Sequence, residues 1–403
     1  MAEREVVIVS AGRSPFGRHL GAMKDVSIIE LGVKVMSTVI QQAGIQPSLV
    51  EEAYVGNCFC FEAEDPSIVG RQIALKAGLR PEVVTATIDT ACTSSMLAIR
   101  LGYQSILLGR SDIVVAGGVE SLSRMGYVVP PVVRWGKKLG GIQMEDPSFP
   151  LGYKEYQPVA VDAGNMALEF NVSREEQDQW AERSQKRYSE AFQAKKFRDE
   201  IIPIEVPLKK KETKILDADE QPRPDTTIKK LSKLRTIFGS PTVTAGNAPG
   251  LNDGGAMVVI MSGEKAKELG LSPLGKIVWA GGRSGAPNHI ATVPGYVIQE
   301  CLQKSGMKLD EMDLIEINEA FAAMPLVSSL VLTGKDRAQA VELRKKINVN
   351  GGAIAIGHPI GASGARVVMT LLYELRRRGG GTGIAAICGG LAQSEGMIIE
   401  SFQ

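Results

Sequence analysis

The sequence has 403 residues, and its 46 Lys and Arg against 45 Asp and Glu give a formal net charge of +1. Hydrophobic residues make up 44% and charged residues 23%, a composition that is typical of a globular protein and excludes wholesale disorder. The charge balance gives no electrostatic reason to expect nucleic acid or an anionic membrane as a partner, and no run of about 18 apolar residues indicates a membrane span.

The first part of the chain alternates short β-branched runs with longer helical patterns, which is typical of α/β architecture with a buried sheet. The length itself favours two or three domains, or one large duplicated unit. Apolar residues at helical spacing predict a helix over residues 93–108. We expect strands over residues 5–10, 52–57, 84–88 and 112–117.

The middle of the chain, residues 122–247, is richer in charge and proline. A capping box from Ser173 to Glu176 predicts the start of a helix that continues through Trp180 and Tyr188. We interpret this region as an excursion inserted into the first unit, because it contains structure of its own. The lysine run at residues 209–211 is expected to be a solvated face.

The last part repeats the arrangement of the first, and residues 280–284 echo residues 10–14. A two-copy duplication would place equivalent strand ends at one shared central site. We therefore expect an N-terminal half over 1–121 that is completed by 248–275, an inserted loop domain over 122–247, and a C-terminal half over 276–403. The expected elements of the last part are strands over 276–280, 313–317 and 383–387 and a helix over 362–377.

Five cysteines are scattered through the chain without the spacing of a disulfide framework, so reduced thiols and an intracellular protein are expected. The N-terminus has acidic residues and no basic region before its apolar run, which argues against a secretory signal and favours a cytoplasmic location. Cys58 and Cys60 lie too close together for a zinc pair and no second pair follows, so no metal site is expected.

Cys92 lies between a predicted buried strand and a predicted helix. A cysteine at a helix N-terminus faces unpaired amides and the positive end of the helix dipole, and both favour the thiolate. Because the thiolate is the nucleophilic form, this position suits covalent catalysis. A buried cysteine that only packs is the alternative.

His358 lies within a glycine-rich segment, residues 350–366, and the chain has only three histidines. So many glycines permit close backbone approach around the imidazole. This histidine could act as a general base toward a cysteine, or it could simply hydrogen-bond a turn.

Two further segments follow predicted strands. Cys388 is followed by Gly389 and Gly390, where the thiol could serve as a second acid or base and the glycine amides could donate to an oxyanion. Small residues at a tightly packed strand end would look the same. Asn318 opens the sequence Asn-Glu-Ala-Phe after the strand at 313–317, where its side chain could orient a water or a substrate oxygen.

Together these segments resemble the thiolase family over essentially the whole chain, and residues 243–254 are similar to the segment by which that family contacts coenzyme A. The resemblance implies an α/β fold of two similar βαβαβαββ halves, packed as a five-layer αβαβα sandwich with an inserted loop domain. It also implies coenzyme A as a co-substrate and no permanently bound cofactor. Ala248, Gly250 and, by a loose alignment, Arg223 would contact coenzyme A; an exposed structural arginine is the alternative for Arg223.

The resemblance implies the following acyl-transfer chemistry on a 3-oxoacyl-CoA. Cys92 attacks the keto carbon while His358 removes its proton, the carbon–carbon bond breaks, and Cys388 protonates the departing enolate. One oxyanion would be held by His358 and a water on Asn318, and the other by the backbone N–H groups of Cys92 and Gly390. Claisen condensation is the same path reversed.

The chain departs from the family pattern at three places. Thr93-Ser94-Ser95 follows the nucleophile, Pro249 stands where the family has a serine that contacts the pantetheine, and Leu391 replaces a third glycine. Residues 158–162 also differ from the segment that lines the acyl pocket of acetoacetyl-type thiolases. We therefore expect a 3-oxoacyl-CoA bulkier than acetoacetyl-CoA.

Alternatives to this interpretation are an acetoacetyl-CoA thiolase, a condensing enzyme of the ketoacyl synthase type, and a non-catalytic acyl-CoA-binding subunit. The terminal cysteine at Cys388 favours a thiolase over a ketoacyl synthase. The resemblance further implies a homodimer or homotetramer, in some members with a small accessory subunit.

Overall fold

The structure is a computed structural model that describes residues 4–59, 67–148, 152–208 and 212–402. Cys60 and the lysine run at residues 209–211 lie outside the described residues, so the expectations for them are not addressed further.

The first half of the fold is a mixed sheet in the order β4-β3-β5-β8-β1. β3 pairs in parallel with β4 and β5, whereas β8 is antiparallel to both of its neighbours. β8 follows the inserted region in the sequence, so the chain returns from that region to complete this sheet. The strands are β1 (Val6–Arg13), β3 (Glu52–Gly56), β4 (Val84–Ile88), β5 (Ile113–Ser121) and β8 (Asn252–Ser262), and the helices are α1 (Ile28–Gln42), α2 (Val69–Lys76) and α3 (Ser94–Leu107).

The second half repeats this topology in the order β10-β11-β12-β9, with one parallel strand pair where the first half has two, followed by antiparallel pairs. The place of β4 is taken by a single parallel bridge between Ile315 and Ile347. The two halves join where β1 pairs with β9 at Val7–Lys276 and Ile8–Gly275. The elements are β9 (Gly275–Ser284), β10 (Leu314–Ile317), β11 (Gly381–Gly389), β12 (Gln393–Ser401), α8 (Val293–Ser305), α9 (Ala323–Leu332) and α12 (Ser363–Arg377).

The strands and helices predicted in both halves are confirmed, but several strands are longer than predicted. β5 and β11 continue through the glycines at which the sequence suggested an end, because the antiparallel neighbours β8 and β12 pair with them along their full length. A ladder of backbone hydrogen bonds thus outweighs the low strand propensity of glycine.

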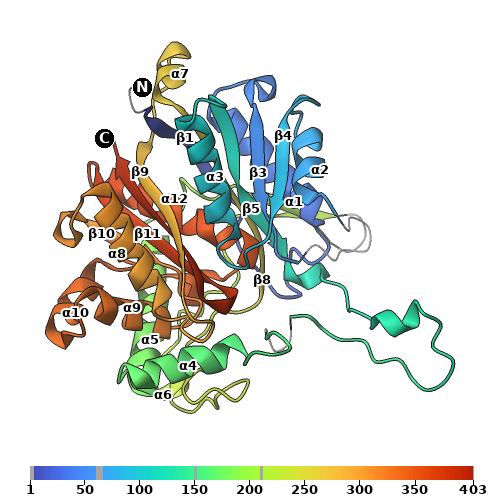
Figure 1. Cartoon of the computed structure of the whole chain (residues 1–403), viewed down its shortest axis with the longest axis vertical. Coiled ribbons are helices and arrows are strands. Elements are labelled where there is room, and N and C mark those ends of the chain that lie inside the picture. Colours follow the sequence, from blue (N-terminus) through green and yellow to red (C-terminus); the bar gives the residue numbers. More distant parts are fainter. Residues whose placement is uncertain (1–3, 60–66, 149–151, 209–211, 403) are drawn as a thin grey trace.

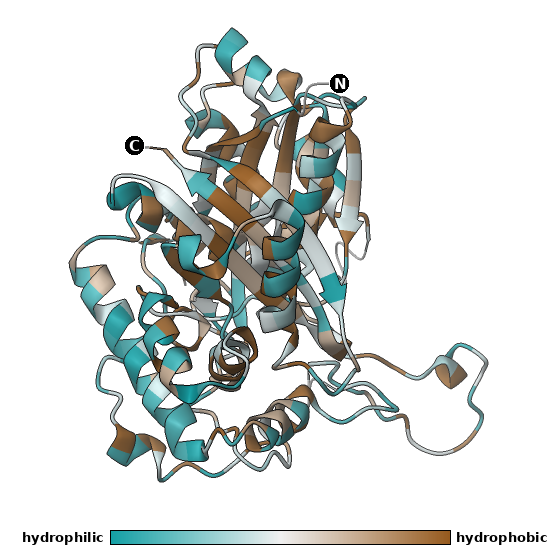
Figure 2. Cartoon of the chain, turned by 60° about the vertical axis from the view of Figure 1, so that its left-hand side comes forward, coloured by the Kyte–Doolittle hydropathy of each residue, from teal (hydrophilic) through white to brown (hydrophobic). Residues whose placement is uncertain are grey.

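Five layers result from this arrangement. α1 and α2 cover the outer face of the first half, α8 and α9 cover that of the second, and α3 and α12 pack between the two halves (Figure 1). α3 and α12 approach closely, since a Cβ added at Gly364 would lie 2.6 Å from the backbone nitrogen of Met96. This contact brings the N-terminal ends of both helices to the same place. Apolar residues concentrate on the central strands, and hydrophilic residues on the outer helices (Figure 2).

The inserted region carries helices and a small hairpin of its own. The predicted capping box at Ser173 and Glu176 is confirmed at the start of α5. Residues 125–148 extend away from the body between β5 and α4, and Trp135 and Leu139 on them are 77% and 89% exposed (Figure 1). Among the described residues, no helix combines the length and the apolar character needed to cross a bilayer. The remaining elements are β2 (Gly17–Arg18), α4 (Val159–Glu169), α5 (Arg174–Gln193), β6 (Ile204–Pro207), β7 (Thr213–Leu216), α6 (Ile228–Leu231), α7 (Gly263–Glu268), α10 (Arg337–Leu343) and α11 (Ala353–Ile356).

Candidate active site

Cys92 lies in a tight turn between β4 and α3, preceded by Ala91 with a φ of 55°. Two hydroxyls fix this turn: Thr93 Oγ1 donates to the Thr90 carbonyl at 2.7 Å, and Ser94 Oγ donates to the Ala91 carbonyl at 2.6 Å. The residues that depart from the family pattern after the cysteine therefore hold the turn that presents it.

The Cys92 thiol is protonated in the free protein. Loss of solvation raises its pKa, and the acidic groups of Cys388, Glu120 and Asp89 raise it further, against a lowering by a backbone hydrogen bond. The expectation that the helix terminus would favour a thiolate is thus wrong, because burial outweighs the helix dipole. A base is needed to remove the proton during attack.

His358 is buried, and its hydrogen bonds determine which ring nitrogen carries the proton. Ser363 Oγ lies 2.6 Å from His358 Nδ1 and 2.8 Å from the Pro359 carbonyl oxygen. A carbonyl only accepts, so the single hydroxyl proton goes to Pro359 and Nδ1–H donates to Ser363. His358 Nε2 is left unprotonated, with a lone pair that faces the amide of Asn318, and this is the form a general base needs.

Asn318 Nδ2 lies 3.5 Å from His358 Nε2. Arg366 sets the orientation of this amide, because its Nη2 only donates and contacts Asn318 Oδ1 at 3.0 Å. Arg366 is itself held by Glu316, whose Oε1 accepts from Nη1 at 2.9 Å. The amide N–H₂ of Asn318 is therefore turned toward the imidazole and is available to a water or an oxyanion.

His358 is neutral at physiological pH. Burial, and secondarily the positive charge of Arg366, lower its pKa to about 3. Because the imidazole is unprotonated throughout the physiological pH range, it is able to accept the Cys92 proton there.

Two buried carboxylates hold the backbone around the imidazole. Glu319 accepts from Trp180 Nε1 at 2.8 Å, Ser184 Oγ at 2.7 Å and Ile354 N at 3.2 Å, which ties the glycine-rich segment to α5 of the inserted region. A Cβ at Gly352 would lie 2.3 Å from Glu319 Cδ, so only glycine fits there.

The second carboxylate, Glu120, ends β5 and accepts from Asn57 Nδ2 at 2.9 Å, Cys58 N at 3.2 Å and Gly361 N at 2.9 Å. Burial raises its pKa to about 7. It links the loop after β3 to the turn that follows His358.

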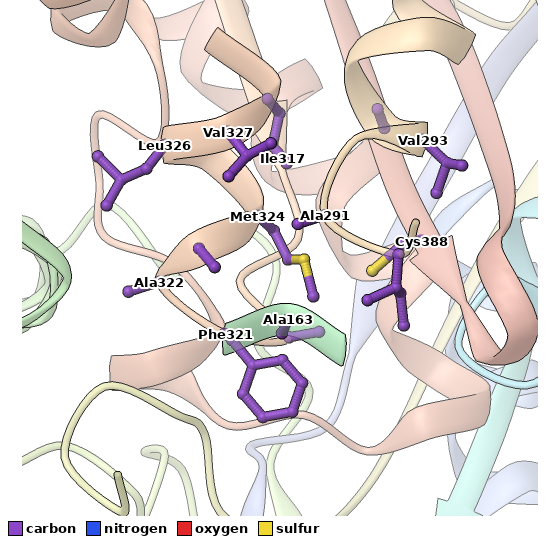
Figure 3. Close-up of a cluster of buried hydrophobic side chains, with 14 of the residues drawn as sticks. Ala163, Ala291, Val293, Ile317, Phe321, Ala322, Met324, Leu326, Val327 and Cys388 are labelled. Carbon is purple, nitrogen blue, oxygen red and sulfur yellow. The ribbon is translucent and has the colours of Figure 1, made fainter. Parts of the chain in front are cut away.

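Cys388 is fully buried near the end of β11, and burial raises its pKa to about 12. The Cys92 turn packs against this strand end, since a Cβ at Gly389 would lie 2.8 Å from the Thr90 carbonyl oxygen. Figure 3 shows Cys388 within a cluster that also contains Met324, Phe321 and Ala163. Leu391, at the position of the family's third glycine, has a φ of 57°, a conformation that glycine adopts more easily.

The structure therefore gathers most of the residues predicted from the sequence. The Cys92 turn packs against the strand end that holds Cys388, and Cys92 packs against the cluster of Cys58, Leu122 and Ile360, of which Ile360 lies two residues after His358. His358 lies beside Asn318, as described above. Gly390 follows Cys388 and Gly389 at the same strand end.

The residues predicted to contact coenzyme A are dispersed. Gly250 directly precedes Leu251, which pairs with His358, and Ala248 is buried nearby in the chain. Arg223 is exposed, and its backbone N–H donates to Gln185 Oε1 at 2.8 Å. No hydrogen bond or ion pair of its guanidinium is found within the described ranges.

Sequence reasoning missed the residues that hold the imidazole and its amide neighbour: Ser363, Arg366 and Glu120. Ser363 and Arg366 lie inside the glycine-rich segment, five and eight residues after His358. Their spacing is compatible with one helical face that points back at the histidine, and this signal could have identified them.

Ser363→Ala is expected to lower kcat by on the order of 10²-fold, because the imidazole loses the acceptor that fixes its tautomer and orientation. KM for coenzyme A should stay within about twofold of the parent value, a split that separates positioning of the base from general loss of structure. Steady-state kinetics on Ser363→Ala and on a control variant, Ser328→Ala, would check this. Ser328 suits the control because it is a buried serine whose hydroxyl donates to the Ala291 carbonyl at 3.2 Å. A Ser363→Ala enzyme with parental kcat would contradict the assignment.

Comparison with known proteins gives consistent matches along the chain. The family model for the thiolase N-terminal domain matches residues 6–264, and that for the thiolase C-terminal domain matches residues 271–401. The chain is 41% identical over 401 residues to an acetyl-CoA acetyltransferase from Allochromatium vinosum, with 98% of each chain covered.

Solved structures agree with these matches. The crystal structure of the Bacillus anthracis acetyl-CoA acetyltransferase aligns with a TM-score of 0.91 at 38% identity and covers 100% of both chains. Human mitochondrial 3-ketoacyl-CoA thiolase in complex with CoA aligns with a TM-score of 0.91 at 36% identity, covering 99% of this chain and 98% of that one.

Proposed function

The chain belongs to the thiolase family and is an acyltransferase of the thiolase type, and from this premise we propose that it transfers the acyl group of a 3-oxoacyl-CoA through an acyl-Cys92 intermediate. The observation that carries this proposal is the neutral imidazole of His358, whose Nε2 lone pair is kept free by the hydrogen bond from Nδ1 to Ser363. A half-buried, protonated thiol at Cys92 requires such a base.

In the proposed cleavage, the Cys92 proton moves to His358 Nε2 as the sulfur attacks the keto carbon. The carbon–carbon bond then breaks, and its electron pair forms the enolate of acetyl-CoA or of a substituted acetyl-CoA. The Cys388 thiol gives its proton to the enolate carbon. Coenzyme A next takes the acyl group; its thiol proton returns to Cys388, and the proton on His358 returns to Cys92.

Each oxyanion in this sequence has a candidate set of donors. The thioester oxygen of the departing enolate would be held by His358 and a water on the amide of Asn318, and the former keto oxygen, which becomes the acyl oxygen on Cys92, by the backbone N–H groups of Cys92 and Gly390. One such donor is typically worth about 3 kcal/mol of barrier lowering. The orientation that Arg366 gives to Asn318 supports the first set, because it turns the amide donors toward the site.

We propose coenzyme A as co-substrate, with contacts from Ala248, Gly250 and Arg223 and without a permanently bound cofactor. The human relative solved in complex with CoA supports this ligand class. We retain as proposals the domain boundaries at 121, 247 and 275, a cytoplasmic location, and a homodimer or homotetramer that works with or without a small accessory subunit.

We further propose that the acyl substrate is bulkier than acetoacetyl-CoA, because residues 158–162 and Pro249 depart from the acetoacetyl-type pattern. The names of several relatives, acetyl-CoA acetyltransferase, favour acetoacetyl-CoA as the second candidate.

A panel of 3-oxoacyl-CoAs from acetoacetyl-CoA upward, assayed for thiolytic cleavage, separates the two candidates. We expect kcat/KM to be highest for a longer or branched member, since an acyl pocket of matching volume gains roughly 10- to 200-fold per well-packed methylene. A clear optimum at acetoacetyl-CoA would remove the bulky-substrate proposal and leave the thiolase assignment in place. Failure of every substrate would contradict the proposed function itself.

A further inference from the structure

Tyr153 lies at the candidate active site although it belongs to the inserted region, far in the chain from Cys92, His358 and Cys388. A Cβ built at Gly390 would lie 1.9 Å from Tyr153 Oη and 3.0 Å from its Cζ. The same point lies 3.4 Å from Ala91 Cβ, in the turn that presents Cys92. The phenol therefore fills the space between the Cys92 turn and the strand end that follows Cys388.

The hydroxyl stays protonated beside the nucleophile. Burial raises the pKa of Tyr153 to about 12, and the nearby acidic groups of Cys92, Asp89 and Cys58 add to this effect. A neutral ring in this position adds volume and an apolar surface without adding charge.

The Tyr153 side chain is not fixed by polar contacts. Within the part of the chain that the structure describes, its hydroxyl makes no hydrogen bond, and its carbonyl accepts only the Tyr156 N–H at 2.8 Å. The residue is 42% exposed, so part of it borders solvent while the hydroxyl end lies against Gly390. Because no polar contact fixes the ring, the space that Tyr153 occupies beside Gly390 depends on the volume of its side chain. A smaller or larger side chain at this position would therefore change that space.

A cavity lies beside the residues that follow Tyr153 in the chain. Glu155, Tyr156 and Gln157, on the same turn, line a cavity of about 430 Å³ together with Asp162 and Asn165 of α4. This volume is within the range of small-molecule sites. Under the proposed function, the amides of Cys92 and Gly390 hold the oxygen of an acyl group on Cys92. The rest of that acyl group must then extend past the side chain that borders both residues, which is Tyr153.

We propose that Tyr153 is a specificity-determining residue, whose ring bounds the acyl-binding space beside Cys92 and Gly390 and so limits the size of the acyl group that is transferred. This inference rests on the proposed function and adds a residue to it. Gly390 contributes to the same arrangement. Its φ is not positive, so the backbone conformation does not require glycine; a side chain is excluded because Tyr153 occupies the space.

The test compares kcat/KM for 3-oxodecanoyl-CoA with kcat/KM for acetoacetyl-CoA in the full-length enzyme. Tyr153→Ala should raise the ratio by about tenfold or more, and Tyr153→Trp should lower it, because ring volume decides how far the acyl chain can extend. Tyr153→Phe keeps the ring and should leave the ratio within about twofold of the parent. Tyr296→Ala is the matched control, because Tyr296 is a partly exposed tyrosine of α8 whose ring contacts Arg283.

An unchanged ratio in both Tyr153→Ala and Tyr153→Trp would overturn the proposal, as would a Tyr153→Phe enzyme with the same shift as Tyr153→Ala, since the hydroxyl and not the ring would then be responsible. The Phe and Trp variants retain an aromatic ring and keep the test decisive if the alanine variant is unstable. Failure of the inference leaves an active enzyme with a constant ratio, whereas failure of the proposed function leaves the parent inactive on both substrates.

Discussion

Cys92→Ser is expected to lower thiolytic turnover by about 10⁴-fold or more, the scale found when a covalent nucleophile is removed from an otherwise intact site. A serine hydroxyl is far more basic than a thiol when ionised, so His358 would have to remove a proton that is much harder to transfer. The thioester exchange with coenzyme A would also be replaced by attack on a less reactive ester. Disappearance of the best 3-oxoacyl-CoA of the panel, followed at saturating coenzyme A, measures this loss.

The matched control is Cys301→Ser, because Cys301 is likewise a free cysteine but is buried on α8, where its sulfur faces Gly396 of β12. Its turnover should stay within a few-fold of the parent. Parental turnover in Cys92→Ser would show that no covalent intermediate forms on this sulfur, and the mechanism would have to be abandoned.

His358→Gln is expected to lower kcat by about 10³-fold, within the range that a positioned general base contributes. The amide occupies similar space but cannot take up the Cys92 proton, so attack would depend on the small fraction of thiolate present. His19→Gln provides the control, because His19 is exposed and its backbone N–H donates to the Leu251 carbonyl at 3.0 Å. A variant at His358 that keeps more than about a tenth of parental kcat would contradict the role of base.

The pH profile of the parent tests the same residue without mutation. A group whose pKa is lowered to about 3 is unprotonated at every pH well above that value, so the base remains available as pH falls from 8 to 5. We therefore expect kcat/KM to show no protonation step near 6.5, the ordinary pKa of histidine. A protonation step in kcat/KM near pH 6.5 that disappears or shifts in the Ser363→Ala variant would show that His358 titrates with its ordinary pKa. That result would contradict a neutral, buried base.

The sequence located the proposed catalytic residues, because each follows a strand within a run of small residues. Cys92 follows β4, Asn318 follows β10 and Cys388 lies next to the end of β11, all of which alternate with helices in a readable pattern. The duplication was visible for the same reason. The duplication is incomplete at one strand. The second half has no full strand equivalent to β4; a single bridge at Ile347 takes its place, and the sequence there has no periodic pattern. The prediction that the strand before Cys92 is buried is wrong, because β4 lies at the edge of the sheet and its residues are exposed or half-buried.

The protonation state of the site could not be predicted from sequence. The position of Cys92 before α3 suggested a thiolate, yet desolvation and nearby negative charge decide the opposite. Such terms depend on which residues from other parts of the chain surround the sulfur, and no local pattern encodes them. The tautomer of His358 likewise depends on a competition between Pro359 and the imidazole for the one proton of Ser363.

Tyr153 illustrates a second limit. Residues 125–157 lack the periodicity of a strand or a long helix, so nothing in the sequence indicated that one of them would reach Gly390. The same holds for Glu319, whose partners on α5 are about 140 residues away in the chain, at Trp180 and Ser184. Contacts at such separation are set by the packed fold and become visible only with it.

The account depends above all on a sulfur–acyl bond at position 92, and mass spectrometry of the enzyme after brief incubation with acetyl-CoA tests this most directly. The account predicts an added acetyl group that is released by free coenzyme A, that maps to the peptide containing Cys92, and that is absent from Cys92→Ser. An acetyl group on a different cysteine, or turnover of 3-oxoacyl-CoA with no acetylated enzyme under any quench, would contradict it.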